Sequence, residues 1–318
     1  MILENGIADF YKEYLKLLKE APEVECRGFK TRELTNVHFS IPDPTDRLVH
    51  LPCRKFNLPF AITEAYLLAI KTNYAIYATA FNKNMMQFAE RDTTMFTHSE
   101  HPEQRDFFYG AYGYRIAESI PEIIEKLRKD PTTRQAVLTI HRIQDSFSSA
   151  KDVPCTIALQ FLIRNNRLEL YVYMRSNDAI WGTPYDVFMF TILQEIVANT
   201  LRISMGSYYH NVTSLHIYEK HYKMADEILE SIEAGKIIRF GFPTGMNYLA
   251  FKQEAYYFFE SITDMNGIKN IIYNKGDDFT RASWMLSTLM YAQDEKEAVV
   301  SPVLSLFMKD YHSLKKVT

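Results

Sequence analysis

The sequence predicts an α+β fold, in which one large mixed β-sheet packs on a central buried helix and further helices surround both. Two neighbouring β-rich runs, 156–163 and 168–174, are separated by Asn165-Asn166, a pair typical of a tight hairpin turn. Residues 185–201 are apolar on nearly every side, as expected of a helix that is buried all round. Helical patterns before and after these segments supply the surrounding helices.

The remaining elements follow from the same kinds of pattern. In chain order we expect a surface amphipathic helix ending near Pro22, loops and short strands over 26–58, an apolar helix over 63–81, a charged surface loop over 90–106, a short helix over 121–129, a strand over 135–141, an extended segment over 214–218 and a helix over 223–234. Residues 235–318 have a mixed pattern that assigns them no role. No repeat or low-complexity linker divides the chain, so residues 1–318 are expected to form a single domain.

The composition excludes several classes of protein. With 318 residues, of which 47% are hydrophobic and 24% charged, the chain can bury a large core without disulfides or metals. The net charge of −3 gives no basic surplus for a nucleic-acid backbone, so direct nucleic-acid binding is not expected. No apolar run is long enough to span a bilayer, and no basic stretch leads into an apolar one at the N-terminus. We therefore expect no membrane association.

The three cysteines, Cys26, Cys53 and Cys155, are far apart in the sequence and odd in number. A disulfide framework is therefore not expected, and no spacing typical of a metal site is present. Unpaired thiols fit a reducing compartment, so we expect a cytoplasmic protein.

Cys155 lies where a loop enters a predicted strand. A lone cysteine is usually a small buried hydrophobic residue, whereas a nucleophilic one needs nearby cations to lower its pKa. Arg175 ends the second strand of the predicted hairpin, and a hairpin brings its two outer ends side by side. Arg175 is therefore expected near Cys155, where its fork of donors can also hold a phosphate. The alternative is a solvated surface arginine.

Four further residues have ordinary structural interpretations when each is taken alone. Asp186 and Glu64 lie near the starts of predicted helices, where a carboxylate interacts favourably with the helix dipole. His216 and Tyr218 share one face of an extended segment.

Taken together, these residues form an ordered set of motifs. In chain order the motifs are Pro-Cys at 154–155, Gln-Phe at 160–161, Arg-Ser-x-Asp at 175–178, Gly-x-Pro-aromatic at 182–185 and His-x-Tyr at 216–218. Cys155 and Arg175 are 20 residues apart, Asp178 and Asp186 are 8 apart, and Asp186 and His216 are 30 apart. This order and spacing resemble the thymidylate synthase superfamily over roughly residues 54–222, and imply a thymidylate synthase-like fold. Upstream, 110–113 and 60–64 resemble the family segments that hold a site tyrosine and the catalytic glutamate.

The resemblance implies covalent catalysis on a pyrimidine nucleoside monophosphate. The Cys155 thiolate adds to C6, and C5 then attacks the methylene carbon of the co-substrate 5,10-methylenetetrahydrofolate. No metal is implied. The resemblance also implies two further groups for the chemistry: Glu64 for acid–base chemistry through water, and Tyr112 for proton handling at C5. It implies that Arg175 and Ser176 bind the phosphate, that Arg134 is lent across a homodimer to the same phosphate, and that Arg27 is a further phosphate contact. The remaining implied roles are substrate binding for Gln160, sugar binding for His216 and Tyr218, and folate binding for Asp178.

Asp186 departs from the thymidylate synthases, which have Asn at this position. The Asn amide pairs with uracil, whereas a protonated Asp offers an acceptor and an O–H donor that suit cytosine. Proton donation toward N3 would also stabilise the charge that forms when the thiolate attacks, so Asp186 is expected to be catalytic. The resemblance thus points to the members of the superfamily that act on dCMP. Ser176 is the residue found in the deoxyribonucleotide enzymes, so it favours dCMP over CMP.

The product is expected to be a hydroxymethyl group. The tail at 314–318 does not resemble the apolar tail that closes thymidylate synthase over its folate, and 60–64 and 109–113 resemble the hydroxymethylases more closely. Water would then add to the intermediate, which gives 5-hydroxymethyl-dCMP and tetrahydrofolate. The alternatives are a CMP hydroxymethylase, a dUMP-directed synthase or hydroxymethylase, a binding protein that has lost catalysis, and an unrelated α+β protein.

Overall fold

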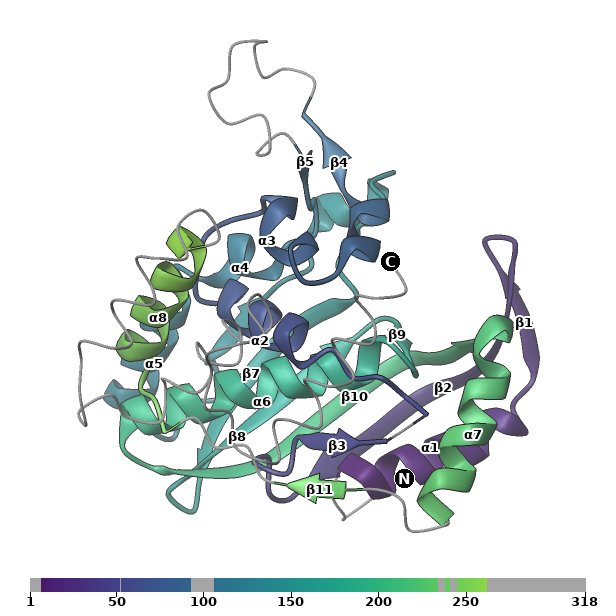
Figure 1. Cartoon of the computed structure of the whole chain (residues 1–318). Coiled ribbons are helices and arrows are strands. Elements are labelled where there is room, and N and C mark those ends of the chain that lie inside the picture. Colours follow the sequence, from purple (N-terminus) through teal and green to yellow (C-terminus); the bar gives the residue numbers. More distant parts are fainter. Residues whose placement is uncertain (1–6, 52, 93–105, 234–237, 241–244, 262–318) are drawn as a thin grey trace, which may run out of the picture.

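A seven-stranded mixed sheet forms the centre of the molecule (Figure 1). The computed structural model describes residues 7–51, 53–92, 106–233, 238–240 and 245–261. The strand order is β1-β2-β10-β8-β7-β6, and β9 pairs with β10 beside this path. The strands are β1 (Glu23–Cys26), β2 (Phe29–Ile41), β6 (Val137–Thr139), β7 (Thr156–Arg164), β8 (Arg167–Met174), β9 (Asn177–Asp178) and β10 (Ser204–Tyr218). β10 runs parallel to β8 and β9, and the other pairs are antiparallel. The predicted mixed sheet is confirmed.

Helices and two small sheets complete the described part of the chain. The helices are α1 (Ile7–Lys19), α2 (Leu58–Leu67), α3 (Ala75–Thr79), α4 (Tyr112–Ile116), α5 (Ile120–Lys129), α6 (Gly182–Leu201), α7 (Tyr222–Glu233) and α8 (Tyr248–Ser261). β3 (Leu48–His50) pairs with β11 (Ile238–Phe240), and β4 (Glu90–Arg91) pairs with β5 (Asp106–Phe107). None of these described helices is long and apolar enough to cross a bilayer.

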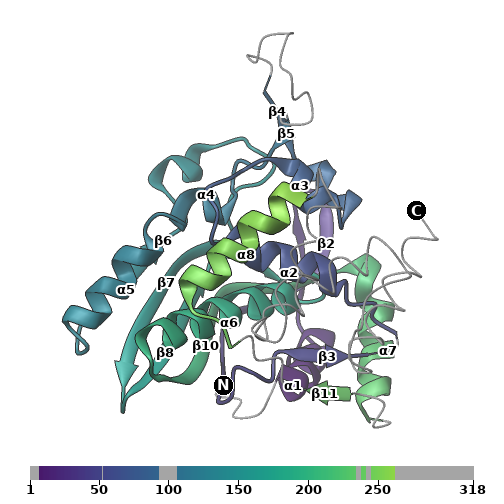
Figure 2. The same cartoon turned by 60° about the vertical axis from the view of Figure 1, so that its left-hand side comes forward.

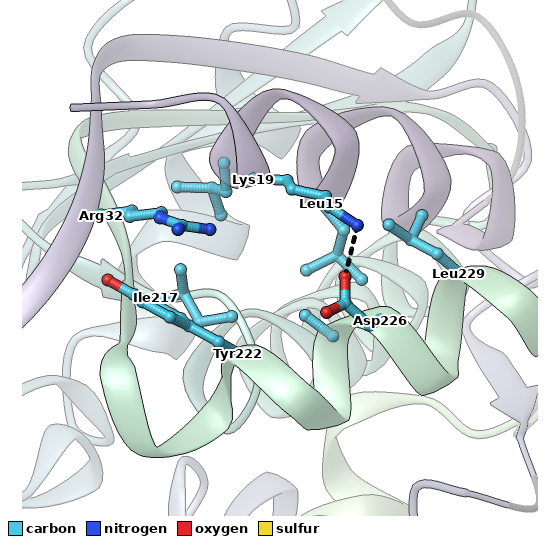
Figure 3. A pocket seen from close by; sticks show the side chains of 9 residues that line it. Leu15, Lys19, Arg32, Ile217, Tyr222, Asp226 and Leu229 are labelled. Atoms are coloured by element: carbon cyan, nitrogen blue, oxygen red, sulfur yellow. Dashed lines mark hydrogen bonds and ion pairs between the residues drawn. The ribbon is translucent and has the colours of Figure 1, made fainter. Parts of the chain in front are cut away.

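α1 packs against β2 and α7 at one end of the sheet, as both views of the molecule show (Figures 1 and 2). Lys19 of α1 donates to Asp226 of α7 at 2.8 Å, and the Arg32 guanidinium lies 4.2 Å from the centre of the Tyr222 ring. These side chains rim a small surface pocket between the two helices (Figure 3). The pocket is lined by core residues such as Leu15, Leu18 and Ile217 and is rimmed by these polar side chains.

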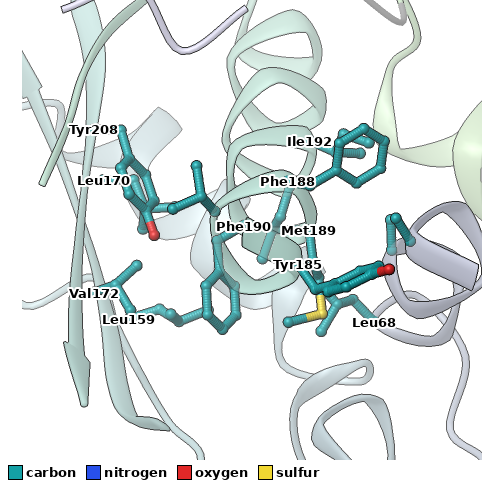
Figure 4. Packing of buried hydrophobic residues seen from close by; sticks show 14 of the residues in the cluster. Leu68, Leu159, Leu170, Val172, Tyr185, Phe188, Met189, Phe190, Ile192 and Tyr208 are labelled. Carbon is teal, nitrogen blue, oxygen red and sulfur yellow. The ribbon is translucent and has the colours of Figure 1, made fainter. Parts of the chain in front are cut away.

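α6 is the central buried helix that the sequence predicts. Every residue from 187 to 198 is buried, because the sheet covers one side of the helix while α2 and α8 cover another. Figure 4 shows Phe190 turned toward the sheet at Val172, and Met189 turned away from the sheet toward Leu68. A helix enclosed in this way has no polar face, which explains why its sequence is apolar all round.

The opposite face of the sheet is only partly covered. Val137 of β6 and Tyr173 of β8 are 41% and 37% exposed. Tyr171 of β8 stacks on Tyr209 of β10, with ring centroids 4.4 Å apart. The sheet therefore buries its helix-facing side and leaves an aromatic and apolar strip on the other.

The predicted hairpin turn is confirmed. Asn165 and Asn166 have φ values of 51° and 57°, the left-handed conformations that a two-residue turn of this kind requires. The helices predicted at 121–129 and 223–234 are confirmed as α5 and α7. The predicted strand at 135–141 is shorter, because pairing with β7 extends only over β6.

The prediction of loops and short strands over 26–58 is wrong, since β2 alone has 13 residues. The first four residues of β2, Phe29–Arg32, pair with β1 in an exposed ribbon, so they show no alternation between apolar and polar side chains. The single helix predicted over 63–81 is also wrong. α2 begins at Leu58, where the Asn57 side chain accepts the Phe60 N–H, and α3 is a separate short helix.

β10 has 15 residues, although the sequence pattern indicated only 214–218. Its first half includes polar side chains such as His210 that face the buried side, and these hide the expected alternation. The tail at 314–318, on which part of the product expectation depends, lies outside the described residues.

Candidate active site

The hairpin of β7 and β8 brings Cys155 and Arg175 together at its open end. Cys155 directly precedes β7, and Arg175 directly follows β8. The Arg175 backbone N–H donates to the Cys155 carbonyl at 2.9 Å, and Arg175 Nη2 lies 3.8 Å from Cys155 Sγ. The guanidinium also donates to two backbone carbonyls just before Cys155, at 2.9 Å each. These bonds hold the cation against the sulfur.

Opposing charges act on the Cys155 thiol. Burial raises its pKa to about 11, and the positive charge of Arg175 acts in the opposite direction. The carboxyl groups of Asp186 and Asp152 add to the rise, while Arg27, in the turn between β1 and β2, makes a smaller contribution that favours the thiolate. A thiolate therefore forms here only where the cations outweigh the carboxyls.

Asp186 lies in the second turn of α6 and faces the same site. Desolvation raises the pKa of its carboxyl to about 7, against the hydrogen bond that Asn177 Nδ2 donates to Oδ2 at 2.7 Å. The negative charge of Asp178 adds to the rise. The interpretation of Asp186 as an ordinary helix-start carboxylate is therefore wrong, since such a carboxylate is solvated and ionised.

Glu64 approaches this site from α2. Burial raises the pKa of its carboxyl well above the ordinary value, and the nearby Asp186 and Asp152 raise it further. Within the described part of the chain, Glu64 Oε2 is buried and has no hydrogen-bond partner. A protonated carboxyl with a free oxygen next to a reacting group can act as an acid or a base.

Tyr112 of α4 lies beside Cys155. Its hydroxyl accepts hydrogen bonds from the Thr156 backbone N–H at 3.3 Å and from Thr156 Oγ1 at 3.0 Å. Burial raises the pKa of Tyr112 well above its usual value, and the charges of Asp186 and Cys155 contribute to the rise. The hydroxyl therefore keeps its proton at neutral pH.

A buried ion pair fixes the position of α4. The side chains of Arg115 and Asp145 are 3% and 1% exposed, and the guanidinium donates to both carboxylate oxygens. Arg115 also donates to the carbonyls of Tyr109 and Ile140. Because Arg115 lies one turn after Tyr112, these bonds determine where the tyrosine hydroxyl points.

The residues expected at the sugar and the folate come from β9 and β10. Asp178 stands opposite His216 in the parallel register, and its Oδ1 accepts the backbone N–H groups of Ile180 and Trp181 at 2.7 Å each. The rings of His216 and Tyr218 lie edge to face with centroids 5.2 Å apart. Burial raises the pKa of Tyr218, and the charges of Asp178 and Cys155 add to this, which places Tyr218 near the sulfur. Ser176 is half-buried directly after Arg175.

Comparison with known proteins agrees with this geometry. The sequence profile of the thymidylate synthase family matches residues 70–242, which is more than half of the chain. The chain belongs to the thymidylate synthase family. The fold expected from the motifs is therefore confirmed.

The relatives of this thymidylate synthase family member include two phage enzymes. A deoxyuridylate hydroxymethyltransferase of Bacillus phage SP01 is 31% identical over 221 residues, which cover 67% of this chain and 57% of that protein. One of Delftia phage PhiW-14 is 29% identical over 224 residues, covering 65% and 58%. A thymidylate synthase of Bacillus licheniformis is 29% identical over 122 residues, covering 35% and 43%. The chain thus spans little more than half the length of the two phage enzymes. Their names refer to deoxyuridylate, so they do not support the expected deoxycytidylate branch.

Two of the expected site residues, Gln160 and Arg134, do not contact the other site residues within one chain. Gln160 Nε2 donates to the Arg134 carbonyl at 2.9 Å, and its Oε1 accepts the Tyr173 hydroxyl at 3.2 Å. Gln160 stands opposite Tyr171 in the hairpin register, several residues from the open end at Cys155, and it points to the partly exposed face of the sheet. Neither residue contributes to the cluster around the sulfur.

Sequence reasoning missed three residues of the site. Asp152 accepts the Gly110 N–H at 3.2 Å and faces Cys155 and Glu64. Asn177 contacts Asp186, and His210 contacts Asn177. Asp152 is three residues before Cys155 and Asn177 lies inside the Arg-Ser-x-Asp motif, so their positions were visible in the sequence; His210 had no signal.

The pocket between α1 and α7 is separate from this site (Figure 3). None of the expected site residues lines it. Among the described residues, no group of His, Cys, Asp and Glu is arranged to hold a metal ion.

Proposed function

We propose that this protein transfers a hydroxymethyl group to C5 of a pyrimidine nucleoside monophosphate, with 5,10-methylenetetrahydrofolate as the one-carbon donor and water as the second reactant. The observation that carries the proposal is the contact of Cys155 with Arg175 opposite the raised-pKa carboxyls of Glu64 and Asp186. The names of the two phage relatives support the hydroxymethyl product.

The reaction balances with the groups present. Cys155 Sγ bonds to C6, and the electron pair of the C5–C6 double bond becomes available for C5 to attack the one-carbon unit. C5 then loses its proton to a base near Tyr112, the bond between the transferred carbon and the folate nitrogen breaks so that tetrahydrofolate leaves, and water adds to the resulting exocyclic methylene. The sulfur leaves C6 as the ring double bond reforms. Glu64, whose Oε2 has no described partner, is suited to move the protons of that water.

For the base we propose cytosine, on the deoxyribonucleotide dCMP. Desolvation keeps the Asp186 carboxyl protonated up to a pH of about 7, and the family has an amide at this position. A protonated carboxyl can donate to N3 of cytosine and accept from its amino group. Ser176, the residue expected in deoxyribonucleotide enzymes, favours dCMP over CMP.

Uracil is the second candidate, and the names of the two phage relatives favour it. The two candidates make opposite predictions for Asp186→Asn. If cytosine is the base, this change shifts activity from dCMP toward dUMP. If uracil is the base, the preference for dUMP is unchanged.

We also propose a homodimer in which Arg134 reaches the phosphate of the partner's substrate. The strip of Val137, Tyr171 and Tyr173 on the uncovered sheet face supports a second copy as its partner, because aromatic and apolar patches of this kind favour association. Arg134 lies beside this face, next to Gln160. Mixing Arg134→Ala with Cys155→Ala subunits should restore activity, since one site of the mixed dimer then has both residues.

A cytoplasmic setting remains part of this proposal. Cys26, Cys53 and Cys155 are all free thiols, which supports a reducing compartment.

The decisive experiment identifies the product. The protein is incubated with dCMP, dUMP or CMP and 5,10-methylenetetrahydrofolate, and the nucleotide is analysed by mass spectrometry. Gain of a hydroxymethyl group with release of tetrahydrofolate supports the proposal. Gain of a methyl group with release of dihydrofolate would refute the water-addition step, and nucleotide binding without turnover would refute catalysis.

A further inference from the structure

A chain of polar side chains runs from the sheet core to Asp186. The Tyr208 hydroxyl lies 2.7 Å from His210 Nδ1, and His210 Nε2 lies 3.2 Å from Asn177 Oδ1. Asn177 Nδ2 donates to Asp186 Oδ2 at 2.7 Å. Tyr208 and His210 are fully buried and Asn177 is 3% exposed, so these bonds have no competition from solvent. None of these three residues has a role in the reaction as described above.

The direction of donation along this chain follows from the orientation of the Asn177 amide, whose nitrogen faces Asp186. Burial lowers the pKa of His210 to about 3, so its ring is neutral and has one donor and one acceptor. Asn177 Oδ1 already accepts from Thr183 Oγ1 at 2.6 Å. A second lone pair of the same oxygen can accept only from a donor, so His210 Nε2 carries the hydrogen and Nδ1 accepts from Tyr208.

This direction determines how Asp186 presents its two oxygens. In the structure the Asn177 oxygen faces Thr183 and His210, and the amide nitrogen faces Asp186. Oδ2 of Asp186 therefore accepts a hydrogen bond, and when the carboxyl is protonated its hydrogen is on Oδ1. The carboxyl then offers a donor at one oxygen and an acceptor at the other, in a fixed order.

The order matters because the two pyrimidines present opposite edges. Cytosine has a donor at position 4 and an acceptor at N3, whereas uracil has an acceptor at position 4 and a donor at N3. A carboxyl whose proton can move to either oxygen would accept both bases. A carboxyl whose proton is held on one oxygen fits only one of them, because a mispaired buried polar group is destabilising.

We propose that Asn177 and His210 are positioning residues that determine base specificity, by fixing which oxygen of Asp186 carries the proton. This deepens the proposed function and rests on it. Gly182 makes the arrangement possible: a Cβ on Gly182 would lie 2.9 Å from Asn177 Nδ2 and 3.6 Å from Asp186 Oδ2. The glycine therefore leaves the space in which the amide reaches the carboxyl.

Other ionisable groups also face Asp186, and they affect how much of it is protonated and not which oxygen holds the proton. Asp178, at the end of β9, raises its pKa. Glu64 of α2, Tyr112 of α4 and Tyr208 of β10 each have their own pKa raised by the charge of Asp186, as does Cys155.

The test is to reverse the donor. In Asn177→Asp the group facing Oδ2 becomes an acceptor, so the proton of Asp186 has to move to Oδ2. We expect the ratio of kcat/KM for dCMP to that for dUMP to move against the parent preference by about tenfold or more. The ratio of the two nucleotide Kd values, measured by calorimetry without folate, should move in the same direction.

A second pair of variants tests the same idea without adding a carboxyl. His210→Phe keeps an aromatic ring against Phe39, which stacks on the imidazole at 4.8 Å, but removes both nitrogens. The base preference should then weaken toward equality. His210→Gln restores an N–H donor toward Asn177 and should recover part of the preference.

Thr191→Val is the matched control. Thr191 is a buried hydroxyl on the same helix, and it donates only to the carbonyls of Val187 and Phe188. Its removal should leave both ratios unchanged. The proposal is overturned if the folded Asn177 and His210 variants keep the parent ratios, or if Thr191→Val changes them as much. If the parent enzyme transfers a methyl group, the proposed function fails while the Kd ratios still decide this inference.

Discussion

Two acidic groups, the buried Asp145 and the half-buried Asp186, are stabilised in opposite ways. Asp145 is paired with Arg115: although desolvation acts to raise its pKa, hydrogen bonds from Arg115 and from the Arg142 backbone lower it to about 2. Asp186 has no such cation, and desolvation raises its pKa to about 7. The first carboxyl is ionised and holds α4 in place, whereas the second keeps a proton that it can give to a ligand. The comparison teaches that the charge of the neighbouring group, and not the extent of burial, decides whether a carboxyl has a structural or a chemical role.

The largest effect is expected for Cys155→Ser, which removes the nucleophile from the chemical side of the comparison. The rate should fall by at least ~10³-fold, because a serine hydroxyl next to Arg175 is a much weaker nucleophile. The melting temperature should change little. The measurement is release of hydrogen from C5 of the nucleotide, and release at the parent rate would contradict the assignment.

Glu64→Gln is expected to lower the rate by ~10²–10⁴-fold, the usual effect of losing a positioned acid or base. Stability should be kept or improved, because the buried Glu64 Oε2 has no described partner to lose. Single-turnover kinetics and urea unfolding measure the two effects. A large loss of stability with normal turnover would show that Glu64 has a structural role and not a chemical one.

Asp145→Asn tests the structural side. Breaking a buried ion pair leaves Arg115 uncompensated and should lower the free energy of unfolding by about 3–5 kcal/mol. Glu125→Gln is the control, since Glu125 pairs with Arg128 on the surface at 43% and 52% side-chain exposure, where such pairs contribute less than about 1 kcal/mol. Equal effects in urea unfolding would contradict the comparison.

The smallest effect is a pH dependence of stability with opposite signs at the two carboxyls. The folded-state pKa of Asp186 lies above its ordinary value of 3.8, so its contribution to stability is complete below that value and is lost as the pH rises through about 7. The folded-state pKa of Asp145 lies below 3.8, so its contribution is lost as the pH falls toward about 2. Asp186→Asn should therefore flatten the loss of stability between pH 3.8 and about 7, and leave the slope above that range unchanged. Unfolding measured at a series of pH values across this range checks this, and an unchanged slope within it would contradict it.

Local patterns in the sequence predicted the parts of the fold that are locally encoded. The β7–β8 hairpin follows from alternating strands and an Asn-Asn turn, and α6 follows from its uninterrupted apolar sequence. β2 was underestimated because its exposed start, paired with β1, shows no apolar–polar alternation, and β10 because polar side chains in its first half are covered by distant segments. Such partners are set by the tertiary fold and leave no periodic signal.

The candidate site divides in the same way. Motif spacing located Cys155, Arg175 and Asp186, and the hairpin geometry explains why the first two meet. The sequence could not predict His210, because its importance lies in which atoms of Asn177 it contacts. The Gln160 side chain bonds to the Arg134 carbonyl and to Tyr173 and not to the groups around the sulfur, so the expected roles of Gln160 and Arg134 depend on a second subunit.

The two-residue turn at 165–166 has a consequence for how this protein tolerates change. From Ala158 to Tyr173 the two strands pair in continuous register, and one irregularity lies between Thr156 and Ala158 next to Cys155. Within the continuous part each strand residue advances ~3.3 Å and alternates sides. Substitutions along β7 and β8 leave the nucleophile and its cation aligned. A single inserted residue would move the guanidinium one step along and turn it to the other face of the sheet. Under the proposed function, the length of that hairpin is as much a part of the chemistry as the sulfur itself.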